Sequence, residues 1–137
     1  MRDEILNWLK QANADYKKAT VLMDNEMFDG VAFYSHQAVE NALKSLHLVR
    51  FKETEKSHSI VYLAQKVEVP KEIMSGIRDL NPQYIVSRYP DVASGVPAEN
   101  YDEEIAQRLL STATKVIEWV TAQMSESENT PDESEEQ

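Results

Sequence analysis

Arg88 is the residue best suited to hold a phosphate group. A guanidinium stays charged and can donate two parallel N–H bonds to one phosphate. Arg88 lies in the segment 83–99, where Tyr84, Tyr89 and Asp91 flank it. Tyrosines beside an arginine can stack a nucleotide base. A structural alternative stays open, in which Arg88 pairs with Asp91 or caps a helix end while Tyr89-Pro90 packs against the turn.

A second set of polar residues lies in the segment 29–50. Gln37, Glu40 and Lys44 recur at spacings of three and four, which places them on one side of a helix. This stripe can line a site shared with Arg88 or with a second subunit. In the alternative, Glu40 and Lys44 form an ordinary i,i+4 ion pair on a polar helix surface.

His58 and Tyr101 stand near the starts of two further expected helices. His58 is interpreted as a hydrogen-bonding residue at a helix start, with general acid–base chemistry as the alternative. The Tyr101 hydroxyl could contact phosphate, although a packed aromatic side chain is the simpler interpretation. His36 and His47 share a helix face but would lie about 16 Å apart at 1.5 Å per residue. Because the chain also has no cysteine, no metal site is expected.

Charge argues against a general surface for duplex DNA. The formal net charge is −10, and the segment 125–137 holds six acidic residues and no basic one. The remaining body therefore carries 14 basic and 18 acidic residues, a net of −4. Surfaces that bind duplex nucleic acid are usually basic. No apolar run approaches a membrane span and no signal peptide is evident, so a cytoplasmic protein is expected.

The elements that position these residues are helices. The chain has only 3 glycines, lacks alternating strand patterns and is rich in helix formers. Apolar residues at spacings of three and four predict long helices over 3–25 and from about Asp29 to Arg50. Joined by a short turn, these two helices should pack antiparallel. The prediction is an all-α, up-and-down bundle of four to five helices built on this pair.

The rest of the chain is predicted in less regular pieces. A short helix capped by Ser57 and another beginning at Pro70 should follow. The segment 83–99 should be largely a loop, and a capping box of Asn100 and Glu103 should start the last helix. Residues 1–124 are assigned to one domain and 125–137 to a disordered acidic tail.

Three segments together resemble the HEPN family (higher eukaryotes and prokaryotes nucleotide-binding domain). Residues 37–44, Gln-Ala-Val-Glu-Asn-Ala-Leu-Lys, match the family's Gln-Ala-x-Glu-x-x-Leu-Lys pattern. His58-Ser59-Ile60, followed by Leu63, is similar to the family's short-helix start. The third segment is Arg88-Tyr89-Pro90-Asp91, with Tyr101 opening the last helix and Ala113, Trp119 and Val120 further on. The resemblance covers about residues 3–123.

This resemblance implies a helical bundle, usually a homodimer, with functions around nucleotides and RNA. Many members are RNase toxins of toxin–antitoxin pairs, others accompany a small nucleotidyltransferase, and others bind nucleotide without known chemistry. RNase members carry arginine and histidine separated by four to six residues. None of the arginines here has a histidine at that spacing, and His58 misses the spacing after Arg50 by one residue. The sequence therefore lacks the motif that the family's RNases use for metal-independent RNA cleavage.

We therefore expect a nucleotide- or RNA-binding module, a homodimer that is the non-catalytic partner of a small nucleotidyltransferase. Its expected ligand residues are Arg88, Tyr89, Asp91, Gln37, Glu40, Lys44, His58 and Tyr101. No catalytic residue and no cofactor is assigned, although ATP or GTP could be the ligand. Two alternatives stay open: a diverged RNase toxin that uses Arg88 and His58, and a structural dimerisation protein without ligand.

Overall fold

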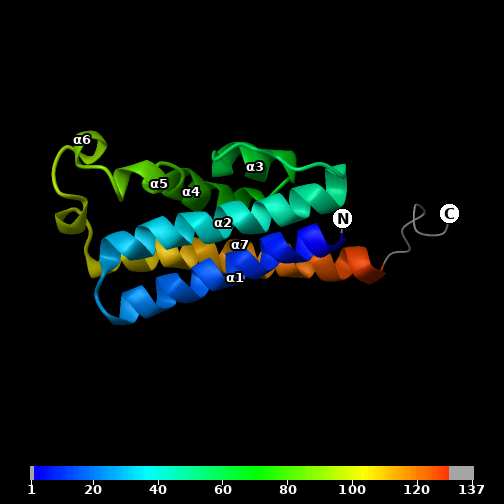
Figure 1. The fold of residues 1–137 in the computed structure, drawn as a ribbon, viewed down its shortest axis with the longest axis horizontal. Helices are drawn as coiled ribbons and strands as arrows, with labels where there is room; N and C mark the ends of the chain where they lie inside the picture. The colour runs from blue at the N-terminus through cyan, green and yellow to red at the C-terminus, as the bar shows by residue number, and fades with distance from the viewer. Residues whose placement is uncertain (1, 130–137) are drawn as a thin grey trace.

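The computed structural model describes residues 2–129, and these residues form an all-α bundle (Figure 1). The five longer helices are α1 (Arg2–Asp24), α2 (Phe28–Phe51), α3 (Ile60–Lys66), α4 (Lys71–Leu80) and α7 (Glu103–Asn129). Between α4 and α7 lie the short elements α5 (Gln83–Val86), α6 (Pro90–Ala93) and the 3₁₀ turn η1 (Pro97–Glu99). None of the helices in this part of the chain is long and apolar enough to cross a membrane.

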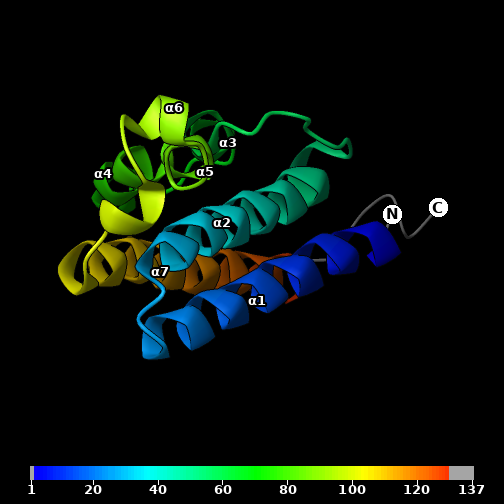
Figure 2. The same cartoon turned by 60° about the vertical axis from the view of Figure 1, so that its left-hand side comes forward.

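The long helices α1 and α2 form an antiparallel hairpin, and α7 packs against both (Figures 1 and 2). Small, fully buried residues lie on both long helices, namely Ala12 and Ala19 on α1 and Ala32, Ala38 and Ala42 on α2. Such residues let helix backbones approach closely, which explains the extensive α1–α2 contact. The predicted antiparallel pair and the all-α bundle are thus confirmed.

A second layer covers the opposite side of α2 from α1 (Figure 2). It contains α3, α4 and α5, all of which contact α2. Asn81, at the end of α4, ties this layer together because its Oδ1 accepts from the backbone N–H of Ile60 at 2.9 Å. Gly76 lets α4 approach α7 closely, since a Cβ there would collide with the Thr112 side chain. This layer brings α5, and with it Arg88, onto α2.

Several predicted boundaries are wrong by a few residues. Helix α2 begins at Phe28 with Met27 at its N-cap position, so Asp29, a good N-cap residue type at the predicted start, lies inside the helix. The cap of α3 is Ser59, whose side chain accepts from Tyr62 N, and Ser57 instead accepts from Ser59 N. Side-chain reach explains the α3 correction, because a capping side chain accepts from an N–H two or three positions after it, as Ser59 does from Tyr62. Helix α2 begins without a side-chain cap, since Met27 makes no such bond.

The start of α7 also differs from the prediction. Asp102 Oδ1 accepts from Ile105 N at 2.8 Å and caps the helix, in place of the predicted Asn100. The segment 83–99 is not mainly loop, because its prolines start the one-turn helices α6 and η1. Helix α7 runs on to Asn129, into the acidic segment predicted to be disordered. The remainder of that segment, 130–137, lies outside the described residues, and the domain boundary at 124 stays a prediction.

Candidate functional site

Four residues of α2 form a line that we call the α2 strip: Phe33, Gln37, Glu40 and Lys44. Their spacings of four, three and four place them on one side of the helix, within an arc of about 60° at 100° per residue. Helix α1 lies along one flank of α2, and α3 and α5 lie along the other (Figures 1 and 2). The strip is therefore the part of α2 over which residues of three other segments converge.

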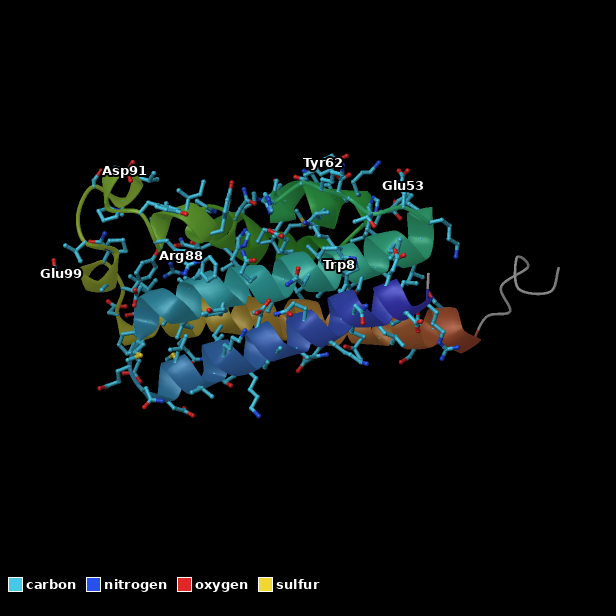
Figure 3. The ribbon with its side chains drawn as sticks, viewed as in Figure 1. Trp8, Glu53, Tyr62, Arg88, Asp91 and Glu99 are labelled. Atoms are coloured by element: carbon cyan, nitrogen blue, oxygen red, sulfur yellow. The ribbon has the colours of Figure 1, made fainter. Side chains whose placement is uncertain are left out.

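Arg88 lies over the N-terminal end of the α2 strip (Figure 3). Its Cζ is 4.0 Å from the centre of the Phe33 ring, a close cation–π contact. Backbone bonds from Arg88 N and Tyr89 N to Ile85 O continue the turn of α5 and hold the arginine in place. Arg88 is nevertheless exposed, and no side-chain hydrogen bond or ion pair occupies its N–H groups within residues 2–129. The predicted alternative, an ion pair with Asp91, is therefore not found there.

Glu40 is the centre of a charged cluster in the middle of the strip. Its side chain is 5% exposed, and Oε2 lies 3.2 Å from Lys44 Nζ. His58 Nδ1 lies 3.2 Å from both carboxylate oxygens. Lys44 in turn lies over the Trp8 ring of α1, 5.4 Å from its centre. The cluster joins α1, α2 and the chain before α3, so Glu40 and Lys44 are buried structural partners and not an exposed polar surface.

His58 differs from its two partners in being open to solvent. Its side chain is 65% exposed, whereas those of Glu40 and Lys44 are 5% and 6% exposed. Because Nδ1 faces the carboxylate, it donates to Glu40, and in the neutral ring Nε2 is then free to accept a proton. The arrangement can bind a ligand or transfer a proton. His58 therefore lies beside Glu40 and Lys44.

His36 and Tyr84 form an aromatic wall beside the strip. Their ring centres are 4.9 Å apart, and the Tyr84 ring is 6.1 Å from that of His58. Gln37 Nε2 donates to His36 Nδ1 at 3.3 Å. The other ring nitrogen of His36, Nε2, is buried and has no hydrogen-bond partner among the described residues. Burial, helped by the nearby His58 and Lys44, lowers the pKa of His36 to about 3, although the Asn81 backbone opposes this shift. His36 is therefore a neutral ring at physiological pH.

The remaining predicted residues lie apart from this cluster. Tyr89 and Asp91 are exposed on the segment of α6, and Asp91 points away from α2 in Figure 3. The Tyr101 hydroxyl donates to Gln83 Oε1, so it is used within the fold. Burial and the Asp29 carboxylate raise the pKa of Tyr101 to about 12. The structure thus brings together Arg88, Gln37, Glu40, Lys44 and His58, but not Tyr89, Asp91 or Tyr101.

Three aromatic or imidazole rings of the site are not predicted as site residues from the sequence. Trp8 belongs to the apolar stripe of the first helix, and His36 stands out only as a possible metal ligand. Phe33 has no polar group to mark it. Phe33 lies four residues before Gln37 and eleven before Lys44, so extending the polar stripe by one turn would have found it. The sequence carries no comparable signal for Trp8, because its contact with Lys44 joins two different helices.

Comparison with known proteins agrees with the fold. The HEPN domain model matches residues 5–126. The crystal structure of TT1696 from Thermus thermophilus is similar, with 31% identity and a TM-score of 0.80, and the match covers 86% of this chain and 96% of that one. ST0689, an archaeal HEPN homologue, shares 32% identity with a TM-score of 0.76 over 87% of this chain and 96% of its own.

A third similar structure is a HEPN domain protein from Thermotoga maritima, and it bears on the fold alone. Its identity is 24%, its TM-score is 0.70, and the match covers 87% of this chain and 98% of that one. No protein of curated function matches this chain. The family model spans most of the sequence and the helical layout agrees with it. This chain therefore belongs to the HEPN domain family.

Proposed function

We propose that this chain is a binding module for a nucleotide or for the end of a single-stranded RNA. Its ligand would lie along the α2 strip, with its phosphate at Arg88. The observation that supports this most is the state of Arg88, which is fixed over Phe33 at 4.0 Å while its N–H groups face solvent. A guanidinium held in this way loses little freedom on binding and can donate two bonds to phosphate.

The neighbouring groups suit the other parts of such a ligand. Tyr84 and His58 can offer ring surfaces to a base, and His58 can donate or accept a hydrogen bond. Arg88 and His58 contact Phe33 and Glu40, which are separated by about 10 Å at 1.5 Å per residue. Glu40 and Lys44 would act indirectly, by holding His58 and Trp8 in place. A homodimer and a small nucleotidyltransferase partner complete the proposal, as the family resemblance implies.

Isothermal titration with ATP, GTP and a short single-stranded RNA tests this proposal. The wild-type chain should bind at least one of them, and Arg88→Ala should weaken binding by about 30-fold, a loss of roughly 2 kcal/mol. Arg78→Ala is the matched control, because Arg78 is also exposed but lies on α4. Binding should also weaken as salt concentration rises. Absence of binding by wild type, or equal binding by Arg88→Ala, would refute the proposed site.

A second candidate function is RNA cleavage, with Arg88 holding the phosphate and His58 as the acid or base. The contact between Glu40 and His58 Nδ1 favours this function. The carboxylate holds one ring nitrogen, and the other, Nε2, stays available to transfer a proton. This function predicts cleavage of single-stranded RNA that is lost in His58→Ala and reduced in Glu40→Gln. If wild-type protein at high concentration leaves the RNA intact, this candidate is eliminated while the binding proposal stands.

A further inference from the structure

The segment 89–99 leaves about half of the surface of three large apolar residues exposed. Tyr89, Val92 and Val96 are 54%, 51% and 50% exposed. Tyr89 and Val92 lie three residues apart on one helical turn, as the bond from Val92 N to Tyr89 O shows. Three large apolar residues within eight positions are an unusual cost for a surface segment unless something packs against them.

This apolar segment is ordered by its own backbone. Ala93 N donates to Tyr89 O at 2.9 Å, and Gly95 N donates to Pro90 O at 3.3 Å. Left-handed conformations at Ser94 (φ 57°) and Gly95 (φ 154°) then reverse the chain before Pro97. Two prolines and these bonds reduce the entropy that binding would cost. The segment is therefore a preformed projection.

The charged residues within the projection are all acidic, although the exposed Arg88 directly precedes it. Asp91 and Glu99 point outward from this end of the molecule (Figure 3). Asp102, Glu103 and Glu104 follow in the chain, and there is no basic residue from 89 to 107. An acidic surface of this kind repels nucleic acid and attracts a basic partner.

We propose that the projection, residues 89–99, is a docking surface for a basic, amphipathic segment of a partner protein. Apolar side chains of the partner would cover Tyr89, Val92 and Val96, while its lysines or arginines would meet Asp91 and Glu99. Asp91 and Glu99 point away from the α2 strip in Figure 3, so these two carboxylates lie outside the proposed ligand site. Its chemistry selects the partner by a combination of apolar contact and positive charge.

The test uses the full chain and a synthetic helical peptide of leucine and lysine, with leucine at positions i, i+3, i+4 and i+7. Fluorescence anisotropy should show binding to wild type, and the same peptide with glutamate in place of lysine should not bind. Val92→Ser/Val96→Ser and Asp91→Lys/Glu99→Lys should each weaken binding at least 10-fold. All four positions are exposed, so both double variants should keep the wild-type circular dichroism spectrum.

Two controls separate this surface from unspecific attraction to an acidic protein. Glu68→Lys/Glu118→Lys makes the same change in net charge at exposed positions elsewhere, and Val21→Ser removes a 50% exposed valine from α1. Both controls should bind the peptide within 2-fold of wild type. Equal weakening by the controls would overturn the proposal. Sedimentation gives a further way to overturn it: if the protein self-associates and Val92→Ser/Val96→Ser abolishes this, the occupant is a second copy.

Discussion

Arg50 and Arg88 lie over aromatic rings toward opposite ends of α2, and the two arginines do different things. Arg50 lies 5.7 Å over Trp119, and its guanidinium also donates to Val67 O and to Gln123 Oε1. Arg88 lies 4.0 Å over Phe33, and its guanidinium donates to no side chain or backbone group of residues 2–129. An arginine over an aromatic ring thus joins three helices at one end of α2. At the other end, a similar contact leaves the guanidinium donors of Arg88 free.

The difference follows from what surrounds each arginine. Near Arg50, the end of α3 and the C-terminal half of α7 approach from two sides and supply carbonyl acceptors. Near Arg88, α5 is a single turn followed by an outward projection, so no acceptor is supplied from beyond it (Figure 2). A saturated guanidinium contributes to folding, whereas an unsaturated one is available to a ligand. Substitutions at each end of α2, and in the cluster between them, test this difference.

The largest effect is expected from Glu40, which lies between the two arginines. Glu40→Leu leaves the buried Lys44 ammonium without its carboxylate and should lower the free energy of unfolding by about 3 kcal/mol. Glu40→Leu/Lys44→Leu removes both charges and should recover most of that loss. Urea unfolding followed by circular dichroism measures both. Equal destabilisation of the single and double variants would show that the charge pair is not what stabilises this cluster.

Arg50→Ala should have the second largest effect, and it should change stability without changing ligand affinity. It removes two hydrogen bonds and a cation–π contact, so the free energy of unfolding should fall by about 2 kcal/mol. Ligand affinity at the α2 strip should remain within 2-fold of wild type. Arg88→Ala should show the reverse, with loss of ligand affinity and a smaller loss of stability, at most about 1 kcal/mol from its cation–π contact. If both variants lose stability equally, the contrast between the two ends of α2 is wrong.

Arg88→Lys tests what a ligand requires at its end of α2. Lysine keeps the charge but lacks the planar pair of donors and stacks less well on Phe33. We expect ligand binding about 5-fold weaker than wild type, or roughly 1 kcal/mol, measured by the same titration. If Arg88→Lys binds as strongly as wild type, the ligand requires only the positive charge. If it loses as much affinity as Arg88→Ala, the ligand requires the planar pair of guanidinium donors.

His36 should have a smaller effect on the free energy of unfolding, and only at acidic pH. Its pKa is about 3 in the folded protein against an ordinary value of 6.5. Between these values the unfolded chain binds the additional proton, so stability falls as pH falls through this window. The loss between pH 6.5 and pH 5.5 should be about 1 kcal/mol. His36→Phe keeps a ring against Tyr84 but cannot bind the proton. Urea unfolding of this variant at pH 6.5 and pH 5.5 should therefore lack this loss of about 1 kcal/mol in the free energy of unfolding.

The helical class, the antiparallel α1–α2 pair and the family could all be predicted from the sequence. These follow from local rules: apolar residues at spacings of three and four define a helix face, and a short turn between long helices brings them together. The stripe of Gln37, Glu40 and Lys44 was predictable for the same reason, because all three lie on one helix. The free donors of Arg88 were not, since they depend on Phe33, 55 positions earlier in the chain.

Which polar residues are buried and which remain available depends on the packing of the helices. Lys44 has the spacing of a surface lysine, yet Trp8 of α1 covers it and Glu40 neutralises it. Asp91 stands three residues after Arg88, yet the turn of α6 directs it away (Figure 3). Helix periodicity gives the direction of a side chain on its own helix, but it does not specify which neighbouring helix meets that side chain. The phosphate-binding role of Arg88 therefore remains the proposal that its free guanidinium supports.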